Sequence, residues 1–261
     1  MEQSPGVSGG ELASKLEAAC LPLMEEWLAD LNLEGGHLLS EIHEDDMRIY
    51  AFLLVRKVID FVAAEVGVDL DATRGRADFR RQFLDNAAHL VDTMDDQVPH
   101  TSGRSRRVAQ FAGRLAAMLK LSDSEIADIE DAARIANLGL INTSQKLFSQ
   151  PRRLSPEELA MARNHSQIGA DILKPMEFLG EIAAMVRYHH ANWDGSGCPE
   201  GIGGEQIPLG ARIIRIADAF EALMSDRPHR RAMSRDEALT ELLKDSGKAF
   251  DPSLVRFSGA M

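Results

Sequence analysis

The distribution of proline is the feature of this sequence that most limits its fold. Ten prolines occur among the 261 residues, but none lies between Pro22 and Pro99. Because an internal proline breaks an α-helix, this proline-free stretch has room for long helices. Apolar residues recur within it at steps of three and four, at Phe52, Val55, Ile59, Val62 and Val66. We therefore expect helices throughout this stretch, including one from Asp78 to Asp95.

The remainder of the chain also carries helix signals. Three serines each stand three residues before a glutamate, the spacing of the capping box that opens a helix: Ser122, Ser155 and Ser234. Apolar periodicity predicts further helices over 177–190 and 211–225, the second apolar on most sides and therefore buried. Gly139 is expected to end the helix that begins at Ser122. Since no run alternates as a strand would, we predict an all-α fold.

The charge balance limits the partners and the location of the protein. Lys and Arg total 29 whereas Asp and Glu total 41, so the formal net charge is −12. This balance argues against nonspecific binding to a nucleic-acid polymer or to an anionic membrane, although it leaves room for a local basic pocket. The most apolar segment, 50–68, contains four charged residues and is too polar to span a bilayer.

The first ten residues lack the pattern of a signal peptide, and two cysteines are too few for a disulfide framework. We expect a cytoplasmic protein.

Four residues in the second half of the chain carry groups that suit a metal ion: His165, His189, His190 and Asp218. Imidazole nitrogens and carboxylate oxygens bind first-row metals such as iron, manganese and zinc. Asp218 lies in a stretch otherwise built for burial, and a buried carboxylate is costly unless it is paired, hydrogen-bonded or metal-bound. The plainer interpretation is that each histidine is a satisfied core or surface residue and that Asp218 pairs with an arginine.

The segment 188–231 contains an ordered set of motifs, namely HH, DGSGCP, IPL, an aspartate in a buried helix, and RPHR. This set closely resembles the HD-GYP family, a branch of the HD-domain metal phosphohydrolases associated with hydrolysis of cyclic di-GMP. The resemblance covers roughly residues 82–258, and His165 matches a further family histidine. It implies an HD-domain helical bundle over 82–261. The smaller N-terminal helical region over 1–80 is expected to serve interaction or dimerisation.

The sequence departs from the family pattern at Arg104, Ala136, Asn137, Leu140 and Cys198. Ala136 and Asn137 replace the name-giving His-Asp pair, and Arg104 replaces an earlier histidine. Leu140 replaces a lysine, and Cys198 replaces the tyrosine of the loop. Alanine offers no lone pair, asparagine brings no negative charge, and arginine adds a permanent positive charge near the ions. The resemblance therefore implies a degenerate member in which no two-metal centre forms.

The retained family positions leave several interpretations open. The three histidines and Asp218 could hold a single iron, manganese or zinc ion. His100, one helical turn before Arg104, is either a substitute ligand or a surface histidine. Alternatively, Arg104 fills the vacated metal position and pairs with Asp218, which leaves a metal-free core. Arg227 and Arg230 match family positions that contact phosphates, and arginine forms bidentate hydrogen bonds to phosphate. The alternative interpretation of these two arginines is a run of basic residues exposed to solvent.

Three hypotheses of function follow. The first is a non-catalytic signalling or regulatory protein, expected to form a homodimer, that binds a protein partner or a cyclic dinucleotide such as cyclic di-GMP. The second is a phosphodiesterase or phosphohydrolase that works with a reduced ligand set and one metal ion. The third is a structural scaffold that binds neither metal nor nucleotide. We expect the first, with no catalytic residue and with either no metal or one divalent ion.

Overall fold

The computed structural model describes residues 73–98, 101–142, 155, 164–174, 176–199, 201–227 and 230–260. The helices predicted within the first 72 residues, His100 and the glutamate partner of Ser155 lie outside the described residues. Arg80–Met261 forms one compact unit, which contains every candidate site residue discussed below. No described helix combines the length and the apolar character that a membrane crossing requires.

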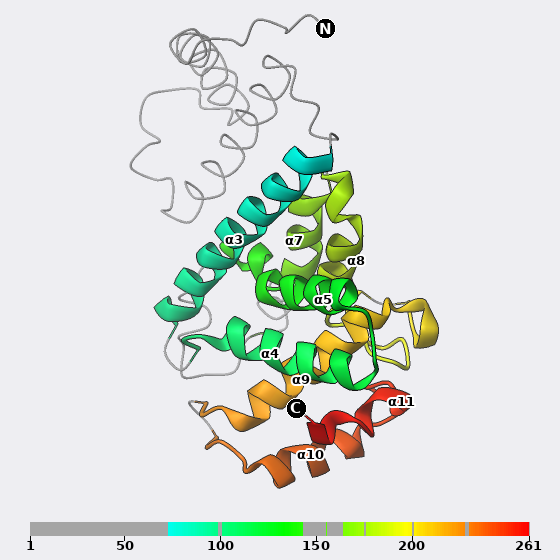
Figure 1. Ribbon diagram of the computed structural model, residues 1–261. Coiled ribbons are helices and arrows are strands. Elements are labelled where there is room, and N and C mark those ends of the chain that lie inside the picture. The colour runs from blue at the N-terminus through cyan, green and yellow to red at the C-terminus, as the bar shows by residue number, and fades with distance from the viewer. Residues whose placement is uncertain are drawn as a thin grey trace, which may run out of the picture. The chain divides into compact units, whose positions relative to one another are not determined.

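The prediction of an all-α fold is confirmed for the described residues, which contain no strand beyond two isolated bridges. The α-helices are α3 (Thr73–Gln97), α4 (Arg104–Met118), α5 (Asp123–Ile135), α7 (His165–Leu173), α8 (Gly180–Tyr188), α9 (Leu209–Met224), α10 (Arg235–Lys244) and α11 (Pro252–Val255). The 3-10 helices are η2 (Leu138–Asn142), η4 (Glu177–Leu179), η5 (Gly204–Gln206) and η6 (Ser258–Ala260). Figure 1 shows α4 beside α9, with α10 and α11 at the C-terminal end of the bundle.

Two of the predicted capping boxes open helices in the structure. The Ser122 hydroxyl accepts a hydrogen bond from the Glu125 N–H, and the Glu125 carboxylate accepts one from the Ser122 N–H. Ser234 and Glu237 repeat this arrangement at the start of α10. Each box satisfies two N–H groups that the first turn of a helix would otherwise leave without a partner. The local sequence therefore sets where α5 and α10 begin.

The prediction that Gly139 ends the preceding helix is wrong. Helix α5 ends at Ile135, Ala136 keeps a right-handed helical conformation, and Gly139 lies inside η2. A Cβ on Gly139 would overlap the carbonyl oxygen of His165 and lie 2.6 Å from the amide nitrogen of Gly169. The glycine is needed because η2 and α7 approach each other backbone to backbone. This close approach places residues 136–140 beside the start of α7.

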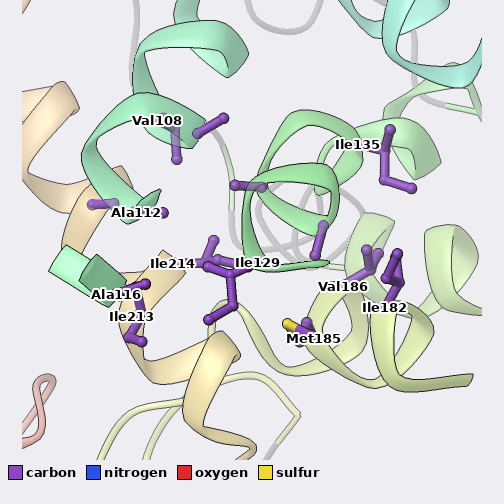
Figure 2. Packing of buried hydrophobic residues seen from close by; sticks show 14 of the residues in the cluster. Val108, Ala112, Ala116, Ile129, Ile135, Ile182, Met185, Val186, Ile213 and Ile214 are labelled. Carbon is purple, nitrogen blue, oxygen red and sulfur yellow. The ribbon is translucent and has the colours of Figure 1, made fainter. Parts of the chain in front are cut away.

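The hydrophobic core fixes α4, α5, α8 and α9 against one another. In Figure 2, Ile129 of α5 lies between Ile214 of α9 and Met185 of α8. Ala112 and Ala116 of α4 are fully buried, and their small side chains allow α9 to approach closely. Burial of an isoleucine side chain stabilises the fold by about 1.5–3 kcal/mol. This packing holds the first turn of α4 against the C-terminal half of α9, where Asp218 lies.

Candidate functional site

Three histidines from two helix ends form a cluster. His165 is the first residue of α7, His189 directly follows α8, and His190 comes next in the chain. The ligand nitrogens of the three rings all lie within 4.8 Å of one another. His165 and His189 are buried, and their Nε2 atoms are 3.3 Å apart. The structure therefore brings together three of the four residues that the sequence predicts as metal ligands.

The tautomer of His189 follows from its backbone partner. Its Nδ1 lies 2.7 Å from the carbonyl oxygen of Val186, and because a carbonyl only accepts, Nδ1 carries the proton. Nε2 is then unprotonated and its lone pair is directed at the cluster, an arrangement common to metal-binding histidines. Burial, aided by the neighbouring His165, lowers the pKa of His189 to about 3. Burial and the adjacent His189 also lower the pKa of His190, so both rings are neutral donors at neutral pH.

The spacing between His165 and His189 fits a shared metal ion. At metal–nitrogen distances of about 2.0–2.1 Å, two nitrogens of a tetrahedral shell lie about 3.3–3.4 Å apart. The 3.3 Å between the Nε2 atoms of His165 and His189 agrees with this value. Three imidazole ligands suit zinc, iron or manganese, with further positions left for solvent or a ligand.

Asp218 is engaged by an arginine. Its Oδ1 lies 2.6 Å from Nη2 of Arg104, and the two side chains are 13% and 19% exposed. Burial, the largest single influence, would raise the pKa of Asp218, but Arg104 together with His189, Arg215 and Arg227 outweighs burial and the pKa is lowered. The carboxylate of Asp218 in turn raises the pKa of Arg104. The structure thus contains the Arg104–Asp218 ion pair that one of the sequence alternatives predicts.

A second buried carboxylate, Glu221, extends this pair into a network. Its Oε1 accepts hydrogen bonds from Nε and Nη2 of Arg107, at 3.1 and 2.8 Å, and from the Ser225 hydroxyl at 2.7 Å. Its Oε2 lies 3.5 Å from Nε of Arg104 and 3.6 Å from Nη2 of Arg227. Glu221 and Arg107 were not among the residues predicted from the sequence. Glu221 could have been found from the sequence, because it is a second carboxylate, three residues after Asp218, in a helix that is predicted to be buried.

The segment from Ala136 to Leu140 lies beside the cluster. Ala136 and Asn137 are buried where α5 ends, and Leu140 is half-buried in η2. The close approach at Gly139 places this segment against His165. Ala136 offers only a methyl group and Asn137 only a neutral amide, so these two positions bring no anionic oxygen to the site.

The glycine-rich loop is fastened to the double histidine. The backbone N–H of Cys198 donates to the carbonyl oxygen of His190 at 3.2 Å. A Cβ on Gly197 would lie 2.6 Å from the same oxygen, so a side chain there would displace the loop. The N–H groups of Trp193 and Asp194 donate to backbone carbonyls of residues 249 and 248. Cys198 thus lies next to the cluster and is half-buried.

The two predicted phosphate-binding arginines differ in their surroundings. Arg230 donates to the carbonyl oxygens of Ala222 and Leu223, at 2.6 and 3.0 Å, and so caps the last turn of α9. Arg227 lies beside Glu221 with its side chain 23% exposed. Only Arg227 therefore joins the charged network, whereas the guanidinium of Arg230 is occupied by backbone oxygens.

Comparison with known proteins identifies similar domains. A family model described as HD domain matches residues 89–254. The chain is 36% identical over 177 residues to the cyclic di-GMP phosphodiesterase response regulator RpfG of Xanthomonas campestris, covering 67% of this chain and 46% of that protein. It is 33% identical over 159 residues to a cyclic di-GMP phosphodiesterase of Thermotoga maritima, covering 59% and 43%. A 3'3'-cGAMP-specific phosphodiesterase of Vibrio cholerae is 29% identical over 207 residues, with 77% and 39% covered. The chain spans less than half the length of each of these relatives.

Solved structures share the fold. An HDG"Y"P protein from Bdellovibrio bacteriovorus aligns with a TM-score of 0.52 at 17% identity, covering 67% of this chain and 61% of that one. A cyclic GMP-AMP-specific phosphodiesterase of V. cholerae aligns with a TM-score of 0.50 at 22% identity, covering 67% and 47%. At these identities the likeness concerns the fold alone.

Proposed function

Because this chain belongs to the HD domain family, we propose that it acts in cyclic-dinucleotide signalling as a domain that binds its ligand without cleaving it. The support for the ligand class is that several relatives are named as phosphodiesterases of cyclic di-GMP or of 3'3'-cGAMP. The support for binding without cleavage is the arrangement of charge around Asp218. On this proposal the chain is a degenerate HD-GYP domain.

The observation that carries the proposal is the ion pair between Arg104 and Asp218, at 2.6 Å. A two-metal phosphodiesterase holds two cations about 3.5–4 Å apart and needs anionic ligands to balance them. Here the buried aspartate is neutralised by a guanidinium, and Ala136 and Asn137 supply no replacement carboxylate. A second divalent ion at this place would have to displace Arg104 or lie against its positive charge.

A single ion is compatible with the same residues. His165, His189 and His190 would hold it, and it would supply a Lewis acid able to polarise a phosphate oxygen. His189 would be oriented by its hydrogen bond to the Val186 carbonyl. The compactness of this cluster favours a second candidate function, a phosphodiesterase with one metal. It predicts turnover that a chelator abolishes.

The partner side of the proposal rests on the part of the chain before residue 80. We propose that this region mediates interaction with a protein partner or formation of a homodimer in the cytoplasm. Deletion of residues 1–72 should lower the measured mass of the particle in solution to that of one chain. An unchanged dimer would place the interface elsewhere.

The test separates binding from cleavage. Cyclic di-GMP is incubated with the protein in iron(II), in manganese and in EDTA, and the products are resolved by chromatography. In parallel, titration calorimetry measures binding of the same nucleotide. The proposal expects binding without formation of linear dinucleotide or GMP. Metal-dependent turnover supports the one-metal candidate instead, and the absence of both turnover and binding refutes both candidates.

A further inference from the structure

We infer that Arg104, Arg107, Arg215 and Arg227 form a metal-independent site for a phosphate-bearing anion, in which guanidinium groups take the place of metal charge. This inference rests on the proposed function and specifies how the dinucleotide would be held. The residues come from the start of α4, the middle of α9 and the turn after α9. Arg104 and Arg107 are one helical turn apart, as are Arg215 and Asp218.

The local charge differs from that of the whole chain. Four guanidinium groups lie around the two buried carboxylates Asp218 and Glu221, and the carboxylates of Asp95 and Asp245 also act on Arg104 and Arg215. Four positive groups against four carboxylates leave this region formally neutral, whereas the chain as a whole carries a formal charge of −12. An anionic ligand therefore meets less repulsion here than elsewhere on this acidic chain.

The arginines are anchored and yet partly accessible. Arg107 uses Nε and Nη2 on Glu221 and Nη1 on the carbonyl of Ser102, and its side chain remains 40% exposed. Arg227 is held only by its 3.6 Å approach to Glu221, and its side chain makes no hydrogen bond within the described residues. A guanidinium has five N–H donors, so both residues retain donors for a ligand. Glu221 thus positions the guanidinium groups of Arg107 and Arg227, while some of the N–H donors of each remain available to a ligand.

The network is also incompletely satisfied at its buried end. Nε of Arg104 and Oε2 of Glu221 are buried, lie 3.5 Å apart and make no hydrogen bond within the described residues. Nε of Arg215 is likewise buried without an acceptor there. Buried donors normally have a partner, so a ligand oxygen that reached these N–H groups would gain hydrogen bonds. Phosphate oxygens match the planar, bidentate donor geometry of arginine.

The experiment compares two adjacent arginines of α4. Arg107→Gln removes a member of the site, whereas Arg106→Gln is the matched control. Arg106 is 60% exposed and pairs with Asp92 on α3 instead of with the network. Binding of cyclic di-GMP and of inorganic pyrophosphate is measured by calorimetry on the full chain in EDTA and again with manganese. Circular dichroism and thermal unfolding check that each variant is folded.

We expect cyclic di-GMP to bind in EDTA with a Kd within twofold of its value in manganese. Arg107→Gln should weaken binding at least tenfold, and Arg106→Gln by no more than twofold. If Arg107→Gln does not fold, Arg227→Gln replaces it, since Arg227 lies outside the helices and carries the same expectation. Pyrophosphate should compete with the nucleotide, because both present phosphate oxygens to the same donors.

Each alternative outcome has one meaning. Binding of cyclic di-GMP only with added metal, or equal affinity in Arg107→Gln and wild type, overturns the inference while the proposed function stands. Binding of pyrophosphate but not of cyclic di-GMP, with the same dependence on Arg107, upholds the anion site and overturns the proposed function. Binding of neither probe in either buffer overturns both.

Discussion

Replacement of Arg104 by methionine perturbs the Arg104–Asp218 pair most directly. The two side chains are 19% and 13% exposed and their closest atoms are 2.6 Å apart, so solvent screens the pair only weakly. With charge centres about 4 Å apart and an effective dielectric constant near 20, the gross attraction is about 4 kcal/mol. Removal of one partner from a buried pair typically costs about 3–5 kcal/mol, because the other charge stays buried without compensation. We expect a loss in this range.

A double-mutant cycle isolates the pair from other effects of the substitution. Asp218→Asn added to Arg104→Met removes the uncompensated charge, so the double variant should be only about 1–2 kcal/mol less stable than wild type. The free energy of unfolding is measured by urea denaturation at pH 7, followed by circular dichroism. Arg106→Met, which breaks an ion pair of a 60% exposed side chain, serves as the control and should cost no more than about 1 kcal/mol. A coupling energy below about 0.5 kcal/mol would refute the reasoning.

Three further predictions concern the histidine cluster and the segment 136–140 beside it. Between pH 6.5 and 3, His189 binds a proton when unfolded but not when folded, so this residue alone should lower stability by about 2 kcal/mol from pH 7 to pH 5 and leave it level above pH 7. His190, whose pKa is also lowered, adds to the fall, which is followed by urea denaturation at each pH. His189→Gln should remove that part of the slope, and a wild-type curve parallel to the variant's would contradict the assignment. Gly139→Ala should destabilise the fold by about 1–3 kcal/mol in the same assay, because its Cβ would overlap backbone of α7, and a neutral result would contradict the close approach. The double restoration Ala136→His with Asn137→Asp should recover little hydrolysis of cyclic di-GMP while Arg104 remains; robust turnover would show that Arg104 is no obstacle.

Local sequence predicted the fold well where local physics decides it. The capping boxes at Ser122 and Ser234 depend on residues three positions apart and appear as expected. The helix predicted over 78–95 lies inside α3 (Thr73–Gln97). The ends of the helix predicted over 211–225 differ from those of α9 (Leu209–Met224) by two residues and by one. The helix predicted over 177–190 is broken into η4 and α8. Gly139 was misjudged because its role depends on a segment distant in sequence, which no local pattern reveals.

The candidate site could be predicted only in part for the same reason. Residue type and motif spacing found the histidines, and the cost of burying a carboxylate predicted that Asp218 needs a partner. The network around Glu221 was missed, because burial of a second carboxylate depends on Arg107 reaching it from another helix. Arg230 was grouped with Arg227 on motif alone, although its guanidinium caps α9. Which donors remain free is a property of the packed structure and not of the motif.

The central claim is that the side chains around Asp218 do not assemble two metal ions. The most direct measurement is the metal content of the purified full chain, by mass spectrometry of the elements, after loading with iron(II) or manganese and removal of free ions. The account predicts at most one ion per chain, lost when His165 and His189 are both replaced by alanine. Two or more ions retained per chain would contradict it.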